Sequence, residues 1–425
     1  MSTATLDAAA SPTRVEPLVT PAGVEAWHVV SPVAPLVALS FVFEGGAAQD
    51  PADKPGVAQM MARLLDEGAG DLDSDAFQER LAAKAIELSF TAGPDGLGGS
   101  LKTLVRHADE AFEVLRLALA EPRFDEAAIE RVRAQTLAGL RYQQNDPGVM
   151  ASKRFFAQAF PGHPYGRPTG GTVESVEAVT RDDLVALHRR MVCRGRVKIA
   201  VVGALDAAQL APLLDRAFAG LPAPEALALV EPRTLVGRGT RTVVDLDVPQ
   251  SVIRFGLAGL SWRDPDFIPA YVLNHILGGG AFTSRLFQEV REKRGLAYSV
   301  GTSLVSYKAA AMTWGYTATK NERVPECLEV IGSEIARLSA DGPGPEELAQ
   351  AKDYITGSYA LGFDTSTKIA HQLTQIASEN LGIDYIARRN GLVAAVTPED
   401  IHRAAARTLY DGQMLVVVAG RPTGL

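Results

Sequence analysis

The chain has 425 residues, a length that suits two domains of roughly 200 residues better than one. Its 47% hydrophobic and 22% charged residues are typical of an ordinary globular protein. The formal net charge of -8 argues against non-specific nucleic-acid binding, which needs clustered Lys and Arg. The two cysteines, Cys193 and Cys327, lie far apart without metal-ligand spacing, so we expect free thiols and no disulfide framework.

The N-terminal segment 1–19 has no basic stretch followed by an apolar one, so it does not resemble a signal peptide. No segment approaches the roughly 18 uninterrupted apolar residues that a membrane-spanning helix requires. We therefore expect a cytoplasmic protein that does not insert into membranes. A periplasmic location is the alternative, if a leader was removed before the sequence begins.

The chain contains an internal duplication, which is its most informative feature. Residues 41–51 match residues 255–265 at an offset of 214. Further landmarks recur at offsets between 216 and 218, namely Glu113–Leu115 with Glu329–Ile331, Leu137–Gly139 with Ile355–Gly357, Val179–Leu184 with Val396–Ile401, and Val201–Gly203 with Val418–Gly420. An offset that is nearly constant over the whole chain indicates a tandem duplication.

Each repeat shows the same succession of predicted elements. It opens with an alternating strand, continues with long amphipathic helices and closes on a buried strand. These elements are the strands 37–43, 197–202, 252–257 and 414–418, and a helix at 125–143. Strands separated by several helices predict an α+β fold of two duplicated domains, each a mainly antiparallel sheet with helices packed on one face.

A linker is predicted between the two repeats. Residues 219–240 are rich in Pro, Ala and Gly and carry no sustained hydrophobic period. The boundaries that follow are an N-terminal domain over 15–218 and a C-terminal domain over 241–425.

A helix and a strand joined by a tight turn are predicted in the second repeat. Residues 283–294 have the pattern of a helix, with Thr283 or Ser284 at its N-cap and Gly295 as its C-terminal stop. Residues 296–300 read as a strand.

Arg291 on this helix and Tyr298 on this strand would converge across the turn. Judged from the residues alone, an ion pair of Arg291 with Glu289 or Glu292 beside a half-buried tyrosine is the more ordinary interpretation.

Four segments resemble the M16 (pitrilysin/insulinase) family of metallopeptidases. They are LGGGAFTSRL at 277–286, REKRGLAY at 291–298, NDP at 145–147 and HPYGRP at 163–168. The resemblance extends from about residue 15 to the end. It implies the small two-domain type of the family, with the fold of the mitochondrial processing peptidase subunits and of bacterial heterodimers.

Catalytic members of this family carry His-x-x-Glu-His on a helix, where two histidines bind zinc and the glutamate is the general base. The matching segment 56–65 has Gln59 and Arg63 at the histidine positions and Ala62 at the base position, and Gly139 matches the third ligand. None of the seven histidines forms a pair at helical spacing. The resemblance therefore implies no zinc in this chain and a zinc ion on a partner subunit.

The family's second signature is an arginine and a tyrosine seven residues apart, which Arg291 and Tyr298 match. In the family this pair reaches the zinc site, where the hydroxyl can hydrogen-bond the scissile carbonyl oxygen, an interaction worth about 3 kcal/mol. Gly278, Gly279 and Gly280 match a glycine-rich substrate-binding loop of the family's non-catalytic subunit. A flexible turn before a helix, with free backbone N–H groups, is an equally good interpretation of these glycines.

The hypothesis that follows is a non-zinc-binding subunit that supplies Arg291 and Tyr298 to an HxxEH partner subunit, in cleavage of peptides or unfolded polypeptide. The alternative is a non-proteolytic peptide-binding or structural scaffold protein of the same fold. Retention of both residues favours the first, because a scaffold has no evident need for the pair.

Overall fold

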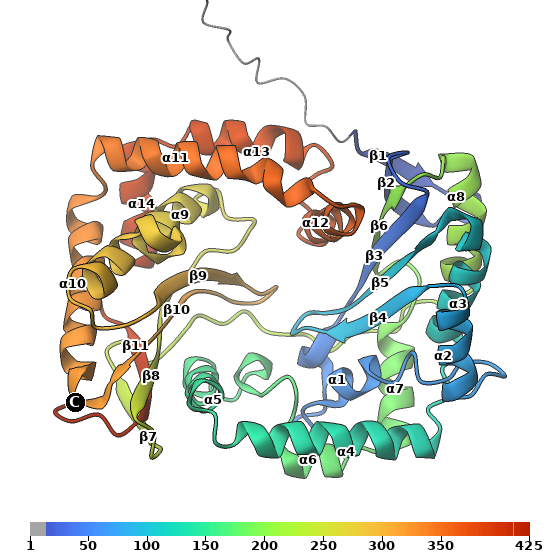
Figure 1. Ribbon diagram of the computed structural model, residues 1–425, viewed down its shortest axis with the longest axis horizontal. Coiled ribbons are helices and arrows are strands. Elements are labelled where there is room, and N and C mark those ends of the chain that lie inside the picture. Colours follow the sequence, from blue (N-terminus) through green and yellow to red (C-terminus); the bar gives the residue numbers. More distant parts are fainter. Residues whose placement is uncertain (1–13, 411) are drawn as a thin grey trace, which may run out of the picture.

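A computed structural model describes residues 14–410 and 412–425 of the chain (Figure 1). Most of the segment that was tested for a signal peptide, residues 1–13, lies outside this range. The described residues form two sheets, each built from one of the two sequence repeats. No helix in this part of the chain is long and apolar enough to cross a membrane.

The first repeat forms a six-stranded sheet in the order β1-β2-β6-β3-β5-β4. Its strands are β1 Glu16–Val19, β2 Glu25–Val30, β3 Leu36–Glu44, β4 Glu87–Ala92, β5 Gly96–Leu104 and β6 Val197–Gly203. The β2–β6 pair is parallel and the other pairs are antiparallel.

The second repeat forms a five-stranded sheet in the order β7-β11-β8-β10-β9. Its strands are β7 Arg241–Asp245, β8 Gln250–Ala258, β9 Val300–Ser306, β10 Ala311–Lys320 and β11 Leu415–Gly420. Again one pair, β7–β11, is parallel and the others are antiparallel. The two strand orders correspond apart from β1, and the predicted α+β fold of two mainly antiparallel sheets is confirmed.

The helices surround the two sheets as a ring in Figure 1. Those of the first repeat are α1 Val57–Ala62, α2 Ser74–Ala83, α3 Ala108–Ala120, α4 Glu126–Gln143, α5 Pro147–Ala159, α6 Val173–Glu177, α7 Arg181–Met191 and α8 Ala207–Leu214. Those of the second are α9 Phe267–Asn274, α10 Val324–Asp341, α11 Pro345–Tyr359, α12 Ser366–Ser378, α13 Tyr385–Ala394 and α14 Pro398–Thr408.

Each repeat places one helix on the sheet of the other repeat. Helix α5 packs on β8 and β11, and the equivalent helix α12 packs on β3 and β6. Phe155 of α5 is fully buried over Gly256 of β8. A Cβ on Gly256 would lie 2.4 Å from the Phe155 Cζ. Thr374 of α12 donates a hydrogen bond from its Oγ1 to the carbonyl oxygen of Ser40, at 3.1 Å. The second face of each sheet is therefore covered by the neighbouring repeat, a feature that the prediction of helices on one face did not contain.

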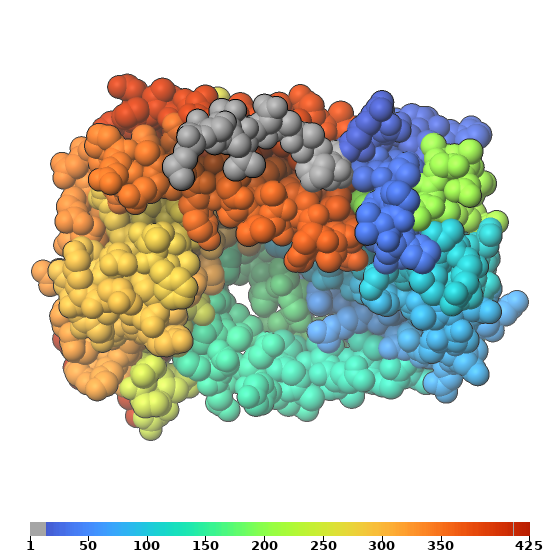
Figure 2. All heavy atoms as spheres, turned by 45° about the horizontal axis from the view of Figure 1, so that its top comes forward, coloured from blue at the N-terminus to red at the C-terminus, as the bar shows by residue number. Residues whose placement is uncertain are grey.

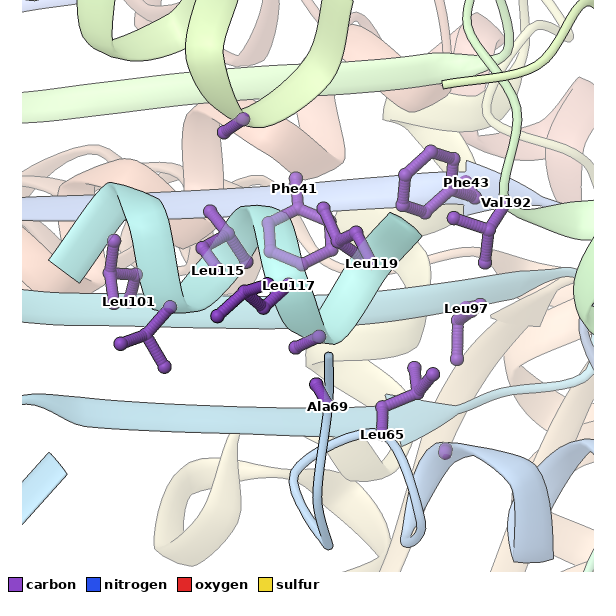
Figure 3. Packing of buried hydrophobic residues seen from close by; sticks show 14 of the residues in the cluster. Phe41, Phe43, Leu65, Ala69, Leu97, Leu101, Leu115, Leu117, Leu119 and Val192 are labelled. Carbon is purple, nitrogen blue, oxygen red and sulfur yellow. The ribbon is translucent and has the colours of Figure 1, made fainter. Parts of the chain in front are cut away.

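The central strands β6 and β11 are buried on both faces, which explains their unbroken apolar sequences. Ile199 and Val201 of β6 belong to the core of the first repeat, whereas Ala200 and Val202 face the exchanged helix α12. Figure 3 shows the core on the first side, where Phe41 and Phe43 of β3 meet leucines of α3. Alternate side chains of one strand thus belong to two separate hydrophobic cores.

A phenylalanine–glycine pair marks the same place in both sheets. Phe41 lies opposite Gly99, and a Cβ on that glycine would lie 2.2 Å from the Phe41 Cζ. Phe255 lies opposite Gly315 in the same way, at 2.1 Å. The ring in each sheet covers the bare backbone of the neighbouring strand, so a larger residue than glycine would displace it.

The segment between the repeats has no helix or strand over residues 222–240, yet it is held to both of them. Ala228 exchanges two hydrogen bonds with the side chain of Gln49, at 2.7 and 3.0 Å. The backbone N–H of Arg233 donates to the carbonyl oxygen of Ala309, at 2.7 Å. The longest continuous run of exposed residues in the segment is 222–226.

Candidate functional site

The degenerate metal-binding motif lies on α1, whose start is fixed by a buried carboxylate. Gly56 precedes the helix with φ 104°, a conformation that favours glycine. Asp50 accepts hydrogen bonds from the N–H groups of Gly56 and Ala58, at 2.7 and 2.8 Å. Burial raises the pKa of Asp50 to about 6, although these two hydrogen bonds oppose the shift.

The positions that hold zinc ligands in catalytic relatives meet in one pocket. Gln59, Arg63 and Gly139 all line this pocket, which lies between α1, α4 and α5 and has a volume of about 710 Å³. Figure 2 shows the molecule hollowed beside the teal helix α4. The Nη1 of Arg63 donates to Thr136 Oγ1 across the pocket, at 3.2 Å. The sequence register that related Gly139 to the motif on α1 is therefore consistent with the structure.

These residues do not fit a zinc ion. An amide, a guanidinium and a glycine replace the two imidazoles and the carboxylate, and a guanidinium cannot lose its proton to become a ligand. Over residues 14–410 and 412–425 there is no group of three or more His, Cys, Asp or Glu side chains that could hold a metal ion.

Arg291 and Tyr298 lie together in the second repeat. The guanidinium carbon of Arg291 is 4.9 Å from the centre of the Tyr298 ring and 4.7 Å from the centre of the Phe287 ring. The three side chains form a cation–π stack. Tyr298 is 84% exposed, so its hydroxyl faces solvent at the end of this stack.

The local backbone differs in part from the predicted helix and strand. Helical residues run from Arg285 to Glu292, and the turns over Phe287–Glu292 are π-helical. The predicted strand over 296–300 is wrong for its first four residues, because β9 begins only at Val300. The carbonyl of Leu296 accepts a hydrogen bond from Thr319 Oγ1, at 2.6 Å, where a strand would form a backbone ladder.

Gly295 ends the helix as predicted. It has φ 58°, and its N–H donates to the carbonyl oxygen of Arg291 at 2.9 Å. The next N–H, that of Leu296, reaches the Val290 carbonyl oxygen at 2.9 Å. This tight reversal brings Tyr298 back over Arg291.

The ordinary interpretation of Arg291 as part of an ion pair is only weakly supported. Its Nε is 3.6 Å from an oxygen of Glu292, longer than a charge-assisted hydrogen bond. Glu289 instead pairs with Lys293 and Arg294, each at 2.6 Å, and these partners lower the pKa of Glu289. Tyr298 is not the half-buried strand residue of that interpretation.

The three glycines do not form a free loop. Helix α9 continues into a π-helical segment, His275–Gly279, that contains Gly278 and Gly279. A Cβ on Gly278 would lie 2.6 Å from Thr302 Oγ1 of β9, so glycine allows the close approach of helix and strand. The N–H of Gly280 donates to the His275 carbonyl oxygen at 2.8 Å. The prediction of a flexible turn with free N–H groups is therefore wrong, whereas the substrate-binding role stays a prediction.

Two aromatic residues of this region had no signal in the sequence pattern. Phe287 lies beneath Arg291, and its ring makes an edge contact with Phe282 at 5.0 Å. Phe282 is 67% exposed and lies two residues after Gly280. Phe282 and Tyr298, both exposed, lie at the two ends of one stack of side chains. This pair of exposed aromatic residues identifies the region on the surface.

The structure keeps the two groups of candidate residues apart. Arg291 and Tyr298 belong to a segment that packs on α10 and β9, and neither lines the pocket around Arg63. Among the described residues of the second repeat, Arg254 of β8 alone lines this pocket. The chain thus does not bring its own arginine–tyrosine pair to its own degenerate metal site.

Comparisons with known proteins relate most of the chain to a single family. Residues 28–173 match the family described as "Insulinase (Peptidase family M16)", and residues 178–355 match "Peptidase M16 inactive domain". The crystal structure of a peptidase M16 inactive domain from Pseudomonas fluorescens superposes with a TM-score of 0.90 at 28% identity, covering 96% of this chain and 98% of that one.

Two relatives show the range of activities that have been named among similar proteins. The "Non-peptidase homolog YmxG" of Helicobacter pylori is 28% identical over 334 residues, which cover 78% of this chain and 76% of that protein. The "Uncharacterized zinc protease Mb2805c" of Mycobacterium bovis is 30% identical over 301 residues, which cover 69% of this chain and 67% of that protein. With its two duplicated α+β units, the chain belongs to the peptidase M16 family.

Proposed function

We propose that this chain is the non-zinc-binding subunit of a heterodimeric M16 metallopeptidase. In this proposal Arg291 and Tyr298 act at the zinc site of an HxxEH partner subunit, in the hydrolysis of peptides or unfolded polypeptide. The observation that carries it is the solvent-facing stack of the two side chains, with 4.9 Å between the guanidinium carbon and the ring centre.

The exposure of Tyr298 supports a role outside the chain's own fold. A tyrosine that is 84% exposed buries little apolar surface, and no hydrogen bond of its hydroxyl is found among the described residues. Its contribution to the stability of this chain is therefore small. The contact with Arg291 nevertheless favours one position of the ring, as positioning of a catalytic hydroxyl requires.

The chemistry of the two groups fits amide hydrolysis. The partner's zinc would activate the attacking water and polarise the scissile carbonyl group. The Tyr298 hydroxyl would donate to the carbonyl oxygen as negative charge develops on it. Arg291, a permanent cation, would attract the same oxygen or a neighbouring substrate carbonyl.

The glycines Gly278–Gly280 complete the proposed substrate-binding surface. Gly279 is exposed at the end of the helical segment, and the exposed Phe282 follows it. An extended peptide that passes the Arg291–Tyr298 stack would meet bare backbone at Gly279 and the aromatic side chain of Phe282 nearby.

A second candidate function is a non-proteolytic scaffold or peptide-binding protein. It is favoured by the Helicobacter pylori relative, whose name denies it peptidase activity. Both candidates predict a protein partner, and they differ in whether the assembled complex hydrolyses peptides.

Reconstitution separates the two candidates. The chain and an HxxEH M16 subunit from the same organism are purified separately, mixed, and assayed with an unfolded protein substrate. We expect activity from the mixture far above that of either subunit, and zinc only in the partner by metal analysis. A mixture that forms a stable complex without any gain in peptidase activity would favour the scaffold.

A further inference from the structure

The pocket around the former metal positions has an unequal charge lining. Three basic side chains line it, Arg63, Lys153 and Arg254, but only one acidic side chain, Asp146. These residues give the pocket a formal charge of +2, in a chain whose net charge is -8. The concentration of positive charge in one concave site of an acidic protein points to an anionic ligand.

Among the described residues, neither guanidinium group of the pocket forms an ion pair with a carboxylate. Among the described residues, Arg63 donates one hydrogen bond, to the hydroxyl of Thr136, and forms no ion pair. Arg254 donates to Ser152 Oγ at 3.0 Å and lies over the ring of Trp314, 5.3 Å from its centre. Burial lowers the pKa of Arg254, and the charge of Asp146 opposes this shift only in part. A half-buried arginine is usually paired, so this one is open to an anion.

The single carboxylate in the pocket is already engaged. The Oδ1 of Asp146 accepts the N–H of Val149 at 2.8 Å and caps the first turn of α5. The rest of the lining is uncharged and includes Leu140 and Phe156, which offer apolar surface. A ligand that combines a negative group with a polypeptide-like body matches this mixture.

We propose that the pocket binds a carboxylate group of a peptide, held by Arg63, Lys153 and Arg254. The planar fork of each arginine matches the two oxygens of a carboxylate. The group could be the C-terminal α-carboxylate or an acidic side chain, since both have the same chemistry. That the ligand is a peptide rests on the proposed function. The binding site itself is separate from Arg291 and Tyr298.

Calorimetric titration of the full chain, without partner, tests this assignment. The probes are an octapeptide that has a free C-terminal carboxylate and no charged side chain, its C-terminal amide, and the amide with one central Glu. We expect at least one of the two carboxylate peptides to bind about tenfold or more tightly than the plain amide at low salt. The difference should shrink as salt screens the charges.

Substitutions locate the site. Arg63→Gln removes an exposed cation from the pocket and should abolish most of the preference for the carboxylate. The matched control is Arg154→Gln, which makes the same change on an exposed residue of α5 that does not line the pocket. Lys153→Gln is a second variant, in case Arg63→Gln unfolds α1.

The outcomes are distinct. Equal affinity for all three peptides, no binding of any peptide, or the same loss in Arg154→Gln would overturn the proposal. So would competition by inorganic phosphate that abolishes binding of amide and carboxylate peptides alike. Because the chain is studied alone, these outcomes are independent of whether Tyr298 acts in catalysis.

Discussion

Replacing Tyr298 by phenylalanine isolates one hydroxyl group. The ring stays on Arg291, and the hydroxyl that is lost has no hydrogen bond among the described residues. We therefore expect a change in the free energy of unfolding of no more than about 0.5 kcal/mol. In the assembled complex we expect kcat to fall about 100-fold, since one donor to a developing oxyanion contributes about 3 kcal/mol.

The assay is steady-state hydrolysis of a quenched fluorescent peptide by the complex. Because the hydroxyl would act mainly in the transition state, kcat and kcat/KM should fall together while KM changes little. Arg291→Lys should also lower kcat, because lysine keeps the charge but loses the planar group that stacks on Phe287 and Tyr298. Arg189→Lys, at an exposed ion pair with Glu225, is the control for the chemical change. Wild-type turnover in Tyr298→Phe, with intact assembly and partner zinc, would refute the catalytic role.

Three further predictions concern the fold. Phe155→Ala should lower the free energy of unfolding by about 3–5 kcal/mol, because it opens a cavity between the repeats. Tyr142→Ala, on the exposed face, should change it little. Urea titration measures both variants, and equal effects would contradict the exchanged packing. Limited proteolysis should cut first within residues 222–226. The two fragments should be of similar mass and stay together on gel filtration. First cleavage inside either repeat would contradict the proposed linker. Because the pKa of Asp50 is raised to about 6 from 3.8, its stabilising contribution is complete at low pH and is lost as the pH rises through 6. The stability of the wild type relative to Asp50→Asn should therefore fall by about 3 kcal/mol between about pH 4 and 7 in urea titrations, and a constant difference would contradict the shift.

The sequence was sufficient to predict the duplication and the central strands. Strands β6 and β11 are interior strands of their sheets, and burial on both faces requires the continuous apolar sequences that can be recognised without a structure. The phenylalanine–glycine pairs repeat for the same reason, since each repeat has the same close contact between strands.

The exchange of helices could not be predicted from the sequence. The amphipathic pattern of α5 shows which side of the helix is buried but does not identify the sheet that covers it. Phe155 would satisfy the pattern equally well on the sheet of its own repeat. Its packing on β8 and β11 is therefore known only from the structure.

The strand predicted at 296–300 shows where local pattern misleads. Leu296 and Ala297 are both buried, so the alternation of a strand is already broken before Tyr298. The left-handed Gly295 turns the chain back toward the helix, and pairing with β10 begins only at Val300. The convergence of Arg291 and Tyr298 was nevertheless predicted correctly, because it depends on the turn and not on the strand.

The proposed peptidase and the scaffold make different demands on the same tyrosine. An interface that only holds a partner would bury the ring of Tyr298 and its stack with Arg291, and phenylalanine would serve as well in that place. Transition-state stabilisation uses the hydroxyl, which the ring merely positions. A Tyr298→Phe complex that assembles normally but turns over slowly is therefore expected from the peptidase, whereas normal assembly with no activity in either form is expected from the scaffold. The exposed hydroxyl is the smallest part of the molecule that separates the two functions.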